Sequence, residues 1–262
     1  PPGLRAGGVR GAVTELILIL VLVGFMAGVI DAVAGGGGLL TVPALLLAGL
    51  PPVEALATNK VQGVMGVGSA AFAYARAGRV DLRAQLGTAL LAGAAGGLGA
   101  LLASWLPVEA IRAILPVLLI AVALYFLLKK GLDDQDRAER LAAPAFGLTA
   151  VPAVGFYDGL LGPGAGSFYM LGFVSLRGMG LLRATAHTKL LNFASNLGAM
   201  LVFSLVAQPW WGTGLLMGLA QVAGAQVGAR LAVRVGAKVI RPLLVVVSLA
   251  LAARLLWQAW AG

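Results

Sequence analysis

The sequence contains no cysteine, a single histidine and few charged residues. Without cysteine the chain can form no disulfide, thiolate metal site or cysteine nucleophile, and His187 alone excludes a multi-histidine metal site within one chain. We therefore expect no metal and no cofactor. Charged residues make up 11% of the chain, whereas soluble domains carry roughly a quarter. The pI is near 10.7, but no basic domain with interleaved aromatic residues is present, so nucleic acid is not an expected partner.

Apolar residues make up 60% of the chain, and the mean hydropathy is +0.96. Eight long apolar runs are present, and each approaches the ~20 residues that a transmembrane helix needs. They lie at residues 14–34, 54–75, 84–105, 108–128, 141–161, 182–207, 212–231 and 239–260. The first run lacks the basic segment and cleavage site of a signal peptide, so we interpret it as a retained helix that follows a lead-in at 1–13. The sequence predicts an all-α polytopic membrane protein with the lipid bilayer around it.

Two shorter apolar pieces, 38–49 and 165–176, each follow a glycine-rich break. Twelve helical residues span about 18 Å, which is well short of a ~30 Å hydrocarbon core. We interpret both pieces as half-helices or re-entrant segments.

Basic residues gather in four short segments, at 76–83, 129–140, 177–183 and 230–241. The intervening connections carry almost no lysine or arginine, so the positive-inside rule predicts that all four segments share the cytoplasmic side. Both termini would then lie outside, although Arg5 and Arg10 argue mildly against this. An aromatic belt on the outer side accounts for the tryptophans at the ends of the spans.

The two halves of the chain resemble each other. The run GVIDAVAGGGGL begins at residue 28, and GFYDGLLGPGAGS begins at residue 155. Asp31 aligns with Asp158 at an offset of 127 residues, and ATNK at 57–60 aligns with AHTK at 186–189 at an offset of 129. Each half therefore reads as a broken or re-entrant hairpin plus three transmembrane helices. An odd number of crossings per half predicts two inverted-topology repeats, at 14–128 and 141–260, joined by a linker at 129–140. Such repeats are typical of secondary transporters.

The glycine-rich breaks are the first candidate for a binding site. Glycine lets the backbone turn and approach a ligand closely, and the N-terminus of a following half-helix favours negative charge. The alternative is that these glycines only permit tight helix packing. The glycines are Gly35, Gly36, Gly37 and Gly38 in the first break and Gly162, Gly164 and Gly166 in the second, where Ser167 begins the half-helix.

Lys60 and Lys189 lie inside apolar helices at equivalent positions of the two halves. A buried ammonium group is costly and usually functional, so the pair predicts an electropositive cavity suited to a sulfonate, sulfite or carboxylate. Alternatively, each lysine pairs with the aspartate of its own half. Asp31 and Asp158 are the acidic residues expected within the membrane, where they relay protons, coordinate a cation, neutralise these lysines or accept hydrogen bonds from the backbone opened at the breaks.

Polar residues accompany both lysines: Thr58 and Asn59 precede Lys60, and His187 and Thr188 precede Lys189. Residues 188, 192, 195 and 196 share one helical face, so Asn192 is expected to face inward with them. A serine hydrolase pairing of Ser195 with His187 is excluded, because eight helical residues separate them by about 12 Å. We do not expect an enzyme.

These residues resemble a known family. The run IDAVAGGGGLLTVPAL from residue 30, ALATNK from residue 55 and ATAHTKLLNF from residue 184 are similar to motifs of the sulfite exporter TauE/SafE family, also called the toluene-sulfonate uptake permeases, in its branch of probable membrane transporters. The resemblance covers about residues 14–260. It implies a multi-pass bacterial inner-membrane transporter of sulfite, sulfonates or sulfoacetate. It also implies that the glycine breaks and the segments 58–60 and 187–189 line the site.

The sequence therefore predicts a secondary transporter of small organic or sulfur-containing anions, with proton coupling left open. A passive anion channel is the alternative, because the same electropositive pocket can conduct. A membrane scaffold would need a large soluble face, and the loops here are short. The many small residues would permit helix association, so a homo-oligomer is compatible with the sequence. The residues leave open which anion is carried, the direction of transport and the coupling ion.

Overall fold

The structure of the chain is a computed structural model that describes residues 6–105 and 133–240, with a few isolated positions elsewhere and with side chains from residue 14 onward. The predicted span 108–128, nearly all of 239–260 and linker residues 129–132 lie outside these ranges. The first described helix begins at Ala6, within the expected lead-in.

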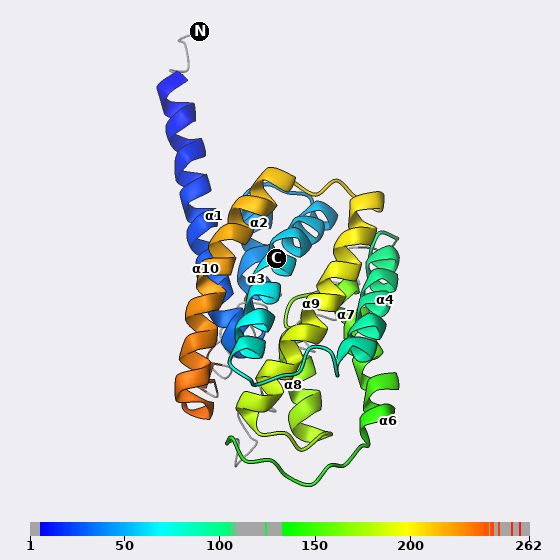
Figure 1. Cartoon of the computed structure of the whole chain (residues 1–262). Helices are drawn as coiled ribbons and strands as arrows, with labels where there is room; N and C mark the ends of the chain where they lie inside the picture. Colours follow the sequence, from blue (N-terminus) through cyan, green and yellow to red (C-terminus); the bar gives the residue numbers. More distant parts are fainter. Residues whose placement is uncertain are drawn as a thin grey trace.

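The described part of the chain is helical throughout and contains no strand, which confirms the all-α prediction (Figure 1). Among the described residues, four helices are long and apolar enough to cross a membrane, so the chain is a multi-pass membrane protein. They are Thr14–Ala34, Leu86–Ala103, Leu181–Val206 and Trp211–Val235. The helices are α1 (Ala6–Ala34), α2 (Gly38–Leu47), α3 (Pro52–Arg76), α4 (Leu86–Ala103), α6 (Ala143–Leu148), α7 (Ala150–Leu160), α8 (Ala165–Ser175), α9 (Leu181–Val206) and α10 (Trp211–Val235).

Two short helices occur where the glycine-rich breaks predict them. Helix α2 has 10 residues and α8 has 11, so each is roughly 15–17 Å long. Gly35, Gly162 and Gly164 have φ values of 77°, 87° and 84°. This left-handed region is readily open to glycine and costly for other residues. The positive φ values therefore explain why glycine ends the preceding helix and begins the turn into the short one.

The predicted span 141–161 is not one continuous helix. It is divided into α6 and α7 at Thr149, which has φ −119° and ψ −70°. Pro152 lies near the start of α7, where it has no N–H to donate and its ring would clash with the carbonyl four residues earlier. The threonine hydroxyl donates to the Ala145 carbonyl at 2.6 Å. The proline therefore explains why the single-helix prediction was wrong.

The helices form two packed groups (Figure 1). Helix α10 packs on α1 and α3, whereas α4 packs on α7 and α9. Small residues make both contacts close: a Cβ atom placed on Gly24 of α1 would lie 2.7 Å from the Met217 carbonyl oxygen of α10. A Cβ atom on Gly155 of α7 would lie 2.7 Å from the Ala92 carbonyl oxygen of α4. Helix α4 of the first half thus packs on helices of the second half, and α10 of the second half packs on helices of the first.

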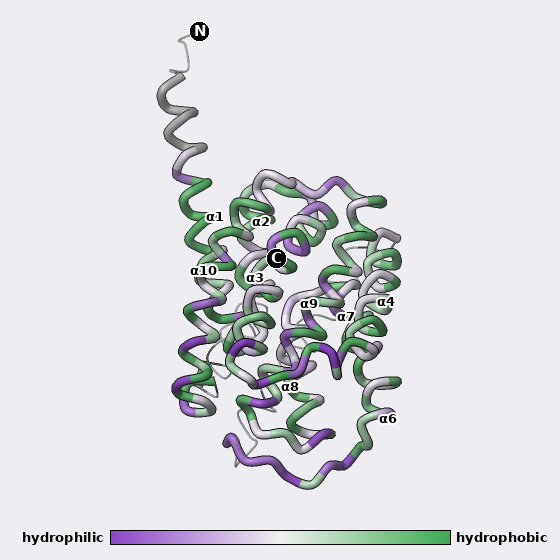
Figure 2. The backbone as a smooth tube through the Cα atoms, in the orientation of Figure 1, coloured by the Kyte–Doolittle hydropathy of each residue, from purple (hydrophilic) through white to green (hydrophobic). Residues whose placement is uncertain are grey.

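The described parts of the four basic segments meet at one end of the molecule. Arg183 pairs with Asp136 at 2.5 Å, and the Asp134 carboxylate accepts the backbone amides of Leu182 and Ala237 at 2.9 Å. The 78–83 loop lines a pocket together with Arg183. Hydrophilic residues colour the linker and the nearby end of α10 in Figure 2. These contacts bring the described parts of the segments to one end, whereas their location on the cytoplasmic side stays a prediction.

Candidate functional site

The two glycine breaks lie directly against each other. The Ser167 hydroxyl, at the start of α8, donates to the carbonyl of Ala34, the last residue of α1, at 2.8 Å. A Cβ atom on Gly35 would lie 2.7 Å from the Ser167 nitrogen, and one on Gly38 would lie 3.4 Å from the Pro163 Cα atom. The backbones can approach this closely because the facing residues are glycines. The structure therefore brings both predicted breaks to one place.

The Lys60 side chain lies against the second break. Its ammonium group is 2.6 Å from the Asp158 carboxylate and donates to the Asp158 carbonyl at 2.5 Å. A Cβ atom on Gly162 would lie 2.8 Å from the lysine Nζ atom, so glycine is required for the lysine to occupy this place. Lys60 is only 1% exposed. Its charge is thus held inside the protein by a carboxylate from the other half of the chain.

Helix α9 supplies the rest of the Asp158 environment. The Ser195 hydroxyl donates to the second carboxylate oxygen, and the Asn196 amide donates to the same oxygen at 2.9 Å. The Asn196 amide also contacts the Asn192 side-chain oxygen at 2.9 Å. Both oxygens of Asp158 therefore have partners, as a buried carboxylate requires.

Lys189 lies in the first break and reaches the other half in the same way. Its ammonium group donates to the backbone carbonyl of Asp31, and the side chain is 0% exposed. The Asp31 carboxylate instead accepts the Gly37 amide at 3.2 Å through Oδ1. The alternative that each lysine pairs with the aspartate of its own half is wrong, because both lysines cross to the opposite half. Sequence spacing could not reveal this crossing.

Two side-chain amides lie beside the breaks. The Asn59 side-chain oxygen accepts hydrogen bonds from the Thr41 hydroxyl at 2.5 Å and the Gln62 amide at 3.0 Å. The Asn59 NH₂ group faces the first break, since it would lie 3.5 Å from a Cβ atom placed on Gly38. The Asn192 NH₂ group would lie 3.1 Å from a Cβ atom on Gly166. Carboxamide nitrogens are donors, so both can contact an anion held at the breaks.

Three predicted site residues lie elsewhere or lack contacts with the breaks. The Thr58 hydroxyl accepts a hydrogen bond from the Trp210 backbone amide at 2.9 Å. The indole of Trp210 donates to Glu54, near the start of α3. The Thr188 hydroxyl is buried with no partner among the described residues. The His187 ring packs 5.6 Å from the Phe173 ring.

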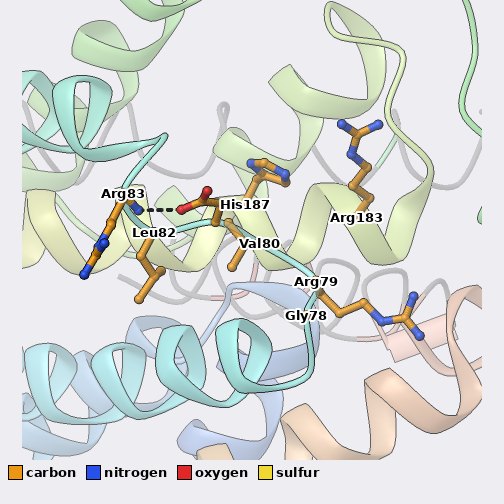
Figure 3. A pocket seen from close by; sticks show the side chains of 8 residues that line it. Gly78, Arg79, Val80, Leu82, Arg83, Arg183 and His187 are labelled. Atoms are coloured by element: carbon orange, nitrogen blue, oxygen red, sulfur yellow. Dashed lines mark hydrogen bonds between the residues drawn. The ribbon is translucent and has the colours of Figure 1, made fainter.

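His187 lines a separate pocket of about 650 Å³ at the basic end (Figure 3). The remaining lining residues are Gly78, Arg79, Val80, Asp81, Leu82, Arg83 and Arg183. The three arginine side chains point in different directions in Figure 3 rather than toward one point. The pocket thus lacks a convergent anion site in this structure.

Sequence reasoning left some contact residues out of the site. Ser195 and Asn196 share a helical face with Asn192, so a signal for them was present in the spacing of three and four residues. Thr41 lies in the middle of α2. Tyr74 lies near the C-terminal end of α3, and its hydroxyl donates to the Ala32 carbonyl at 3.0 Å. Nothing in the local sequence pattern marks these two residues.

The central charges balance and are closed off from solvent. With Lys60, Lys189, Asp31 and Asp158 all ionised, the four groups together carry no net charge. Their exposed fractions range from 0 to 6%. Within the described residues, no group of three or more histidines and carboxylates is placed to hold a metal ion. Ionised groups this deeply buried in a membrane protein commonly mark a transport pathway.

The chain is a multi-pass helical membrane protein of the transporter class. This class is indicated by its apolar spans, by the two broken helices that meet and by the buried charged residues at their junction. The sequence profile of the sulfite exporter TauE/SafE family matches residues 20–255. The chain belongs to this family. Its relatives include the probable membrane transporter protein ORF9 of Sinorhizobium sp., which is 56% identical over 92% of this chain and 93% of its own length.

Two further relatives carry similar names. The probable membrane transporter protein YfcA of Escherichia coli strain K12 is 46% identical over 94% of this chain and 92% of its own length. A probable membrane transporter protein of Haemophilus influenzae is 42% identical over 94% of this chain and 97% of its own length. No solved structure gives a significant match to the chain. The family and these relatives are described as membrane transporters, not as enzymes.

Proposed function

We propose that the protein is a secondary transporter of small organic or sulfur-containing anions, of the sulfite, sulfonate and sulfoacetate class, with its binding site where the two glycine breaks meet. The observation that carries this proposal is the pair of fully buried lysines, Lys60 and Lys189, which reach the junction of the breaks from opposite halves. The description of the family as sulfite exporters agrees with it.

An inverted repeat is part of the proposal, and matched glycine contacts support it. A Cβ atom on Gly28 would lie 2.9 Å from the Ala225 nitrogen of α10, and one on Gly159 would lie 2.8 Å from the Ala100 nitrogen of α4. Helix α1 thus meets α10 much as α7 meets α4. Helices α3 and α9 run in opposite directions, because Gly63 faces Asn196 whereas Gly68, further along α3, faces the earlier residue Phe193. Two like groups in opposite orientation are expected of inverted repeats.

The junction suits a negative ligand. Hydrogen-bond donors surround it: the two lysine ammonium groups and the side-chain amides of Asn59 and Asn192. The first turns of α2 and α8 add the positive ends of two helix dipoles. The Asp31 carboxylate already occupies the position of an anion at the N-terminus of α2, where it accepts the Gly37 amide. A substrate sulfonate or carboxylate offers the same oxygen chemistry. We propose that such a group binds beside these donors, where the glycines of the two breaks add no side chains.

A carrier fits the burial of these groups better than a passive channel does. Asp31 and Asn59 are each 6% exposed, and Lys189 is 0% exposed. A channel that is open to conduction would wet the charged groups along its path. A carrier instead passes through a closed state, in which the site faces neither side. We propose that the structure corresponds to this closed state.

The proposed orientation follows from the charge distribution. We propose that the end holding the linker 129–140 faces the cytoplasm, since basic residues gather there, and that the host membrane is the bacterial inner membrane. The two repeats are proposed to extend over 14–128 and 141–260. Small residues on helix surfaces would permit a homo-oligomer.

Counterflow in proteoliposomes tests the function. Vesicles preloaded with unlabelled sulfite or methanesulfonate should accumulate the radiolabelled anion transiently, because a carrier exchanges its substrate across the membrane. Lys189→Ala should abolish this signal, whereas the exposed control Lys238→Ala should retain it. Unitary conductance without counterflow would establish the channel, and no flux for any sulfur oxyanion, sulfonate or carboxylate would reject both.

A further inference from the structure

The two membrane-embedded aspartates occupy equivalent positions in the sequence repeat but have different surroundings. Asp158 has an ammonium group at 2.6 Å on one oxygen and the Ser195 and Asn196 donors on the other. Asp31 has one backbone amide on Oδ1, at 3.2 Å. Its Oδ2 atom is buried and has no hydrogen-bond partner among the described residues. A buried carboxylate oxygen without a donor is costly and therefore calls for a functional explanation.

The nearest cation does not satisfy this oxygen. Among the described residues no lysine or arginine lies within ion-pair distance of the Asp31 carboxylate, although Lys189 bonds the carbonyl of the same residue. Asp31 and Lys189 therefore interact electrostatically without a direct side-chain contact. A carboxyl group can take up a proton on the free oxygen without first breaking an ion pair. Asp158 would have to give up Lys60 to do so.

The other charged and titratable groups near Asp31 are few. Helix α3 contributes Tyr74, and α7 contributes Asp158. Helices α2 and α8 carry no Asp, Glu, Lys, Arg or His, and the two arginines of α10 are exposed. Lys189 is thus the cation that balances Asp31.

A proton on Asp31 changes the charge of the junction. With both aspartates ionised, the two lysines are balanced and the centre is neutral. Protonation of Asp31 neutralises that carboxylate and leaves Lys189 with a buried positive charge that lacks a counter-ion. An unpaired buried charge is strongly unfavourable, and a monovalent anion at the breaks would supply the missing counter-charge. Proton and anion should therefore favour each other's binding.

We propose that Asp31 is the proton-binding carboxyl group of this transporter, that Asp158 stays ionised in its ion pair with Lys60, and that protonation of Asp31 frees Lys189 to bind one anionic charge of the substrate. The proton comes from water and binds Oδ2 of Asp31, and no covalent bond to substrate forms. The last part of the proposal depends on the proposed anion transport, whereas the first two parts do not.

Linkage gives the expected magnitude. If one proton binds with each anion, the anion affinity increases by up to tenfold for each unit by which the pH falls. Reciprocity requires that a bound anion favours the protonated carboxyl group by the same factor. Transport of a monovalent anion with one proton then moves no net charge.

Infrared difference spectroscopy of the purified full chain at acidic and neutral pH tests the carboxyl assignment without any ligand. A protonated carboxyl group gives a C=O stretching band that the carboxylate lacks. The exposed carboxyl groups contribute to this band in every variant, so we expect one component of the wild-type band to be lost in Asp31→Asn and retained in Asp158→Asn. In Lys189→Gln the band should persist at neutral pH, because an uncompensated Asp31 charge would be too costly in this site. If Asp158→Asn does not fold, the comparison of Asp31→Asn with the wild type decides.

Loss of this component in Asp158→Asn with retention in Asp31→Asn would overturn the assignment, as would identical spectra for Asp31→Asn and the wild type. The linkage is tested by adding methanesulfonate, whose charge does not change across this pH range, and the band should then grow. Counterflow of methanesulfonate without growth of the band would reject the linkage. Absence of flux for every anion would reject the proposed transport but leave the Asp31 assignment standing on its spectra.

Discussion

Substituting Lys60 with methionine removes the ammonium group but keeps a side chain of similar length. The lysine is 1% exposed, and its ammonium group is 2.6 Å from Asp158. Removal leaves the Asp158 charge buried with only the Ser195 and Asn196 donors. Breaking one partner of a buried ion pair costs about 3–5 kcal/mol. At roughly 2–4 °C per kcal/mol for a chain of this size, the unfolding temperature should fall by about 6–20 °C.

Thermal unfolding of the purified protein in detergent, followed by intrinsic tryptophan fluorescence, measures the effect. Lys238→Met makes the same chemical change at an exposed position and should shift the free energy of unfolding by less than about 0.5 kcal/mol. The double variant Lys60→Met with Asp158→Asn removes both charges and should recover most of the loss, because no unpaired charge remains. A single variant as stable as the control, or a double variant no better than the single one, would refute the buried ion pair.

Three further changes probe the packing, the junction of the breaks and the linker. Gly159→Ala places a methyl group against the α4 backbone and should cost about 1–3 kcal/mol of unfolding free energy, whereas Gly212→Ala, with open space around it, should unfold like the wild type. Ser167→Ala leaves a buried carbonyl of α1 without its donor, so we expect a loss of about 1–3 kcal/mol and slower counterflow. The hydrogen bond from the Gly180 amide lowers the pKa of Asp136 in the folded protein. The Asp136 carboxylate therefore stabilises the fold at pH values above its unfolded-state pKa. This contribution is lost as the pH falls through the folded-state pKa. Unfolding temperatures of Asp136→Asn should therefore depend less on acid pH than those of the wild type.

Much of the architecture could be predicted from the sequence because apolar run length and glycine position act locally. Runs long enough to span lipid became α1, α4, α9 and α10, and the glycine-rich breaks preceded the short helices α2 and α8. The division at Thr149 was not predicted. Pro152 is compatible with the first turn of a helix, so its presence does not by itself show that helix α6 precedes it within the same apolar run.

The site was predictable in composition but not in its connections. Buried lysines and aspartates stood out because charge is costly in lipid. Which lysine meets which aspartate depends on how the halves pack, and no sequence spacing encodes that. The same limit applies to Thr58 and His187, because neighbours along a helix point in different directions. Thr58 turns to the Trp210 amide, and His187 turns to the basic end.

An anion-preferring junction at the two breaks is the central proposed feature of the protein, and the absence of cysteine from the chain allows a clean test of it. A Cβ atom on Gly38 meets no atom closer than 3.4 Å, so Gly38→Cys should fold with its thiol between the breaks. We predict that an anionic methanethiosulfonate reagent modifies this thiol faster than a cationic one of similar size, and that methanesulfonate slows the reaction. Gly212→Cys, away from the junction, should show neither effect. Faster modification of Gly38→Cys by the cationic reagent, or no modification by either, would contradict the account.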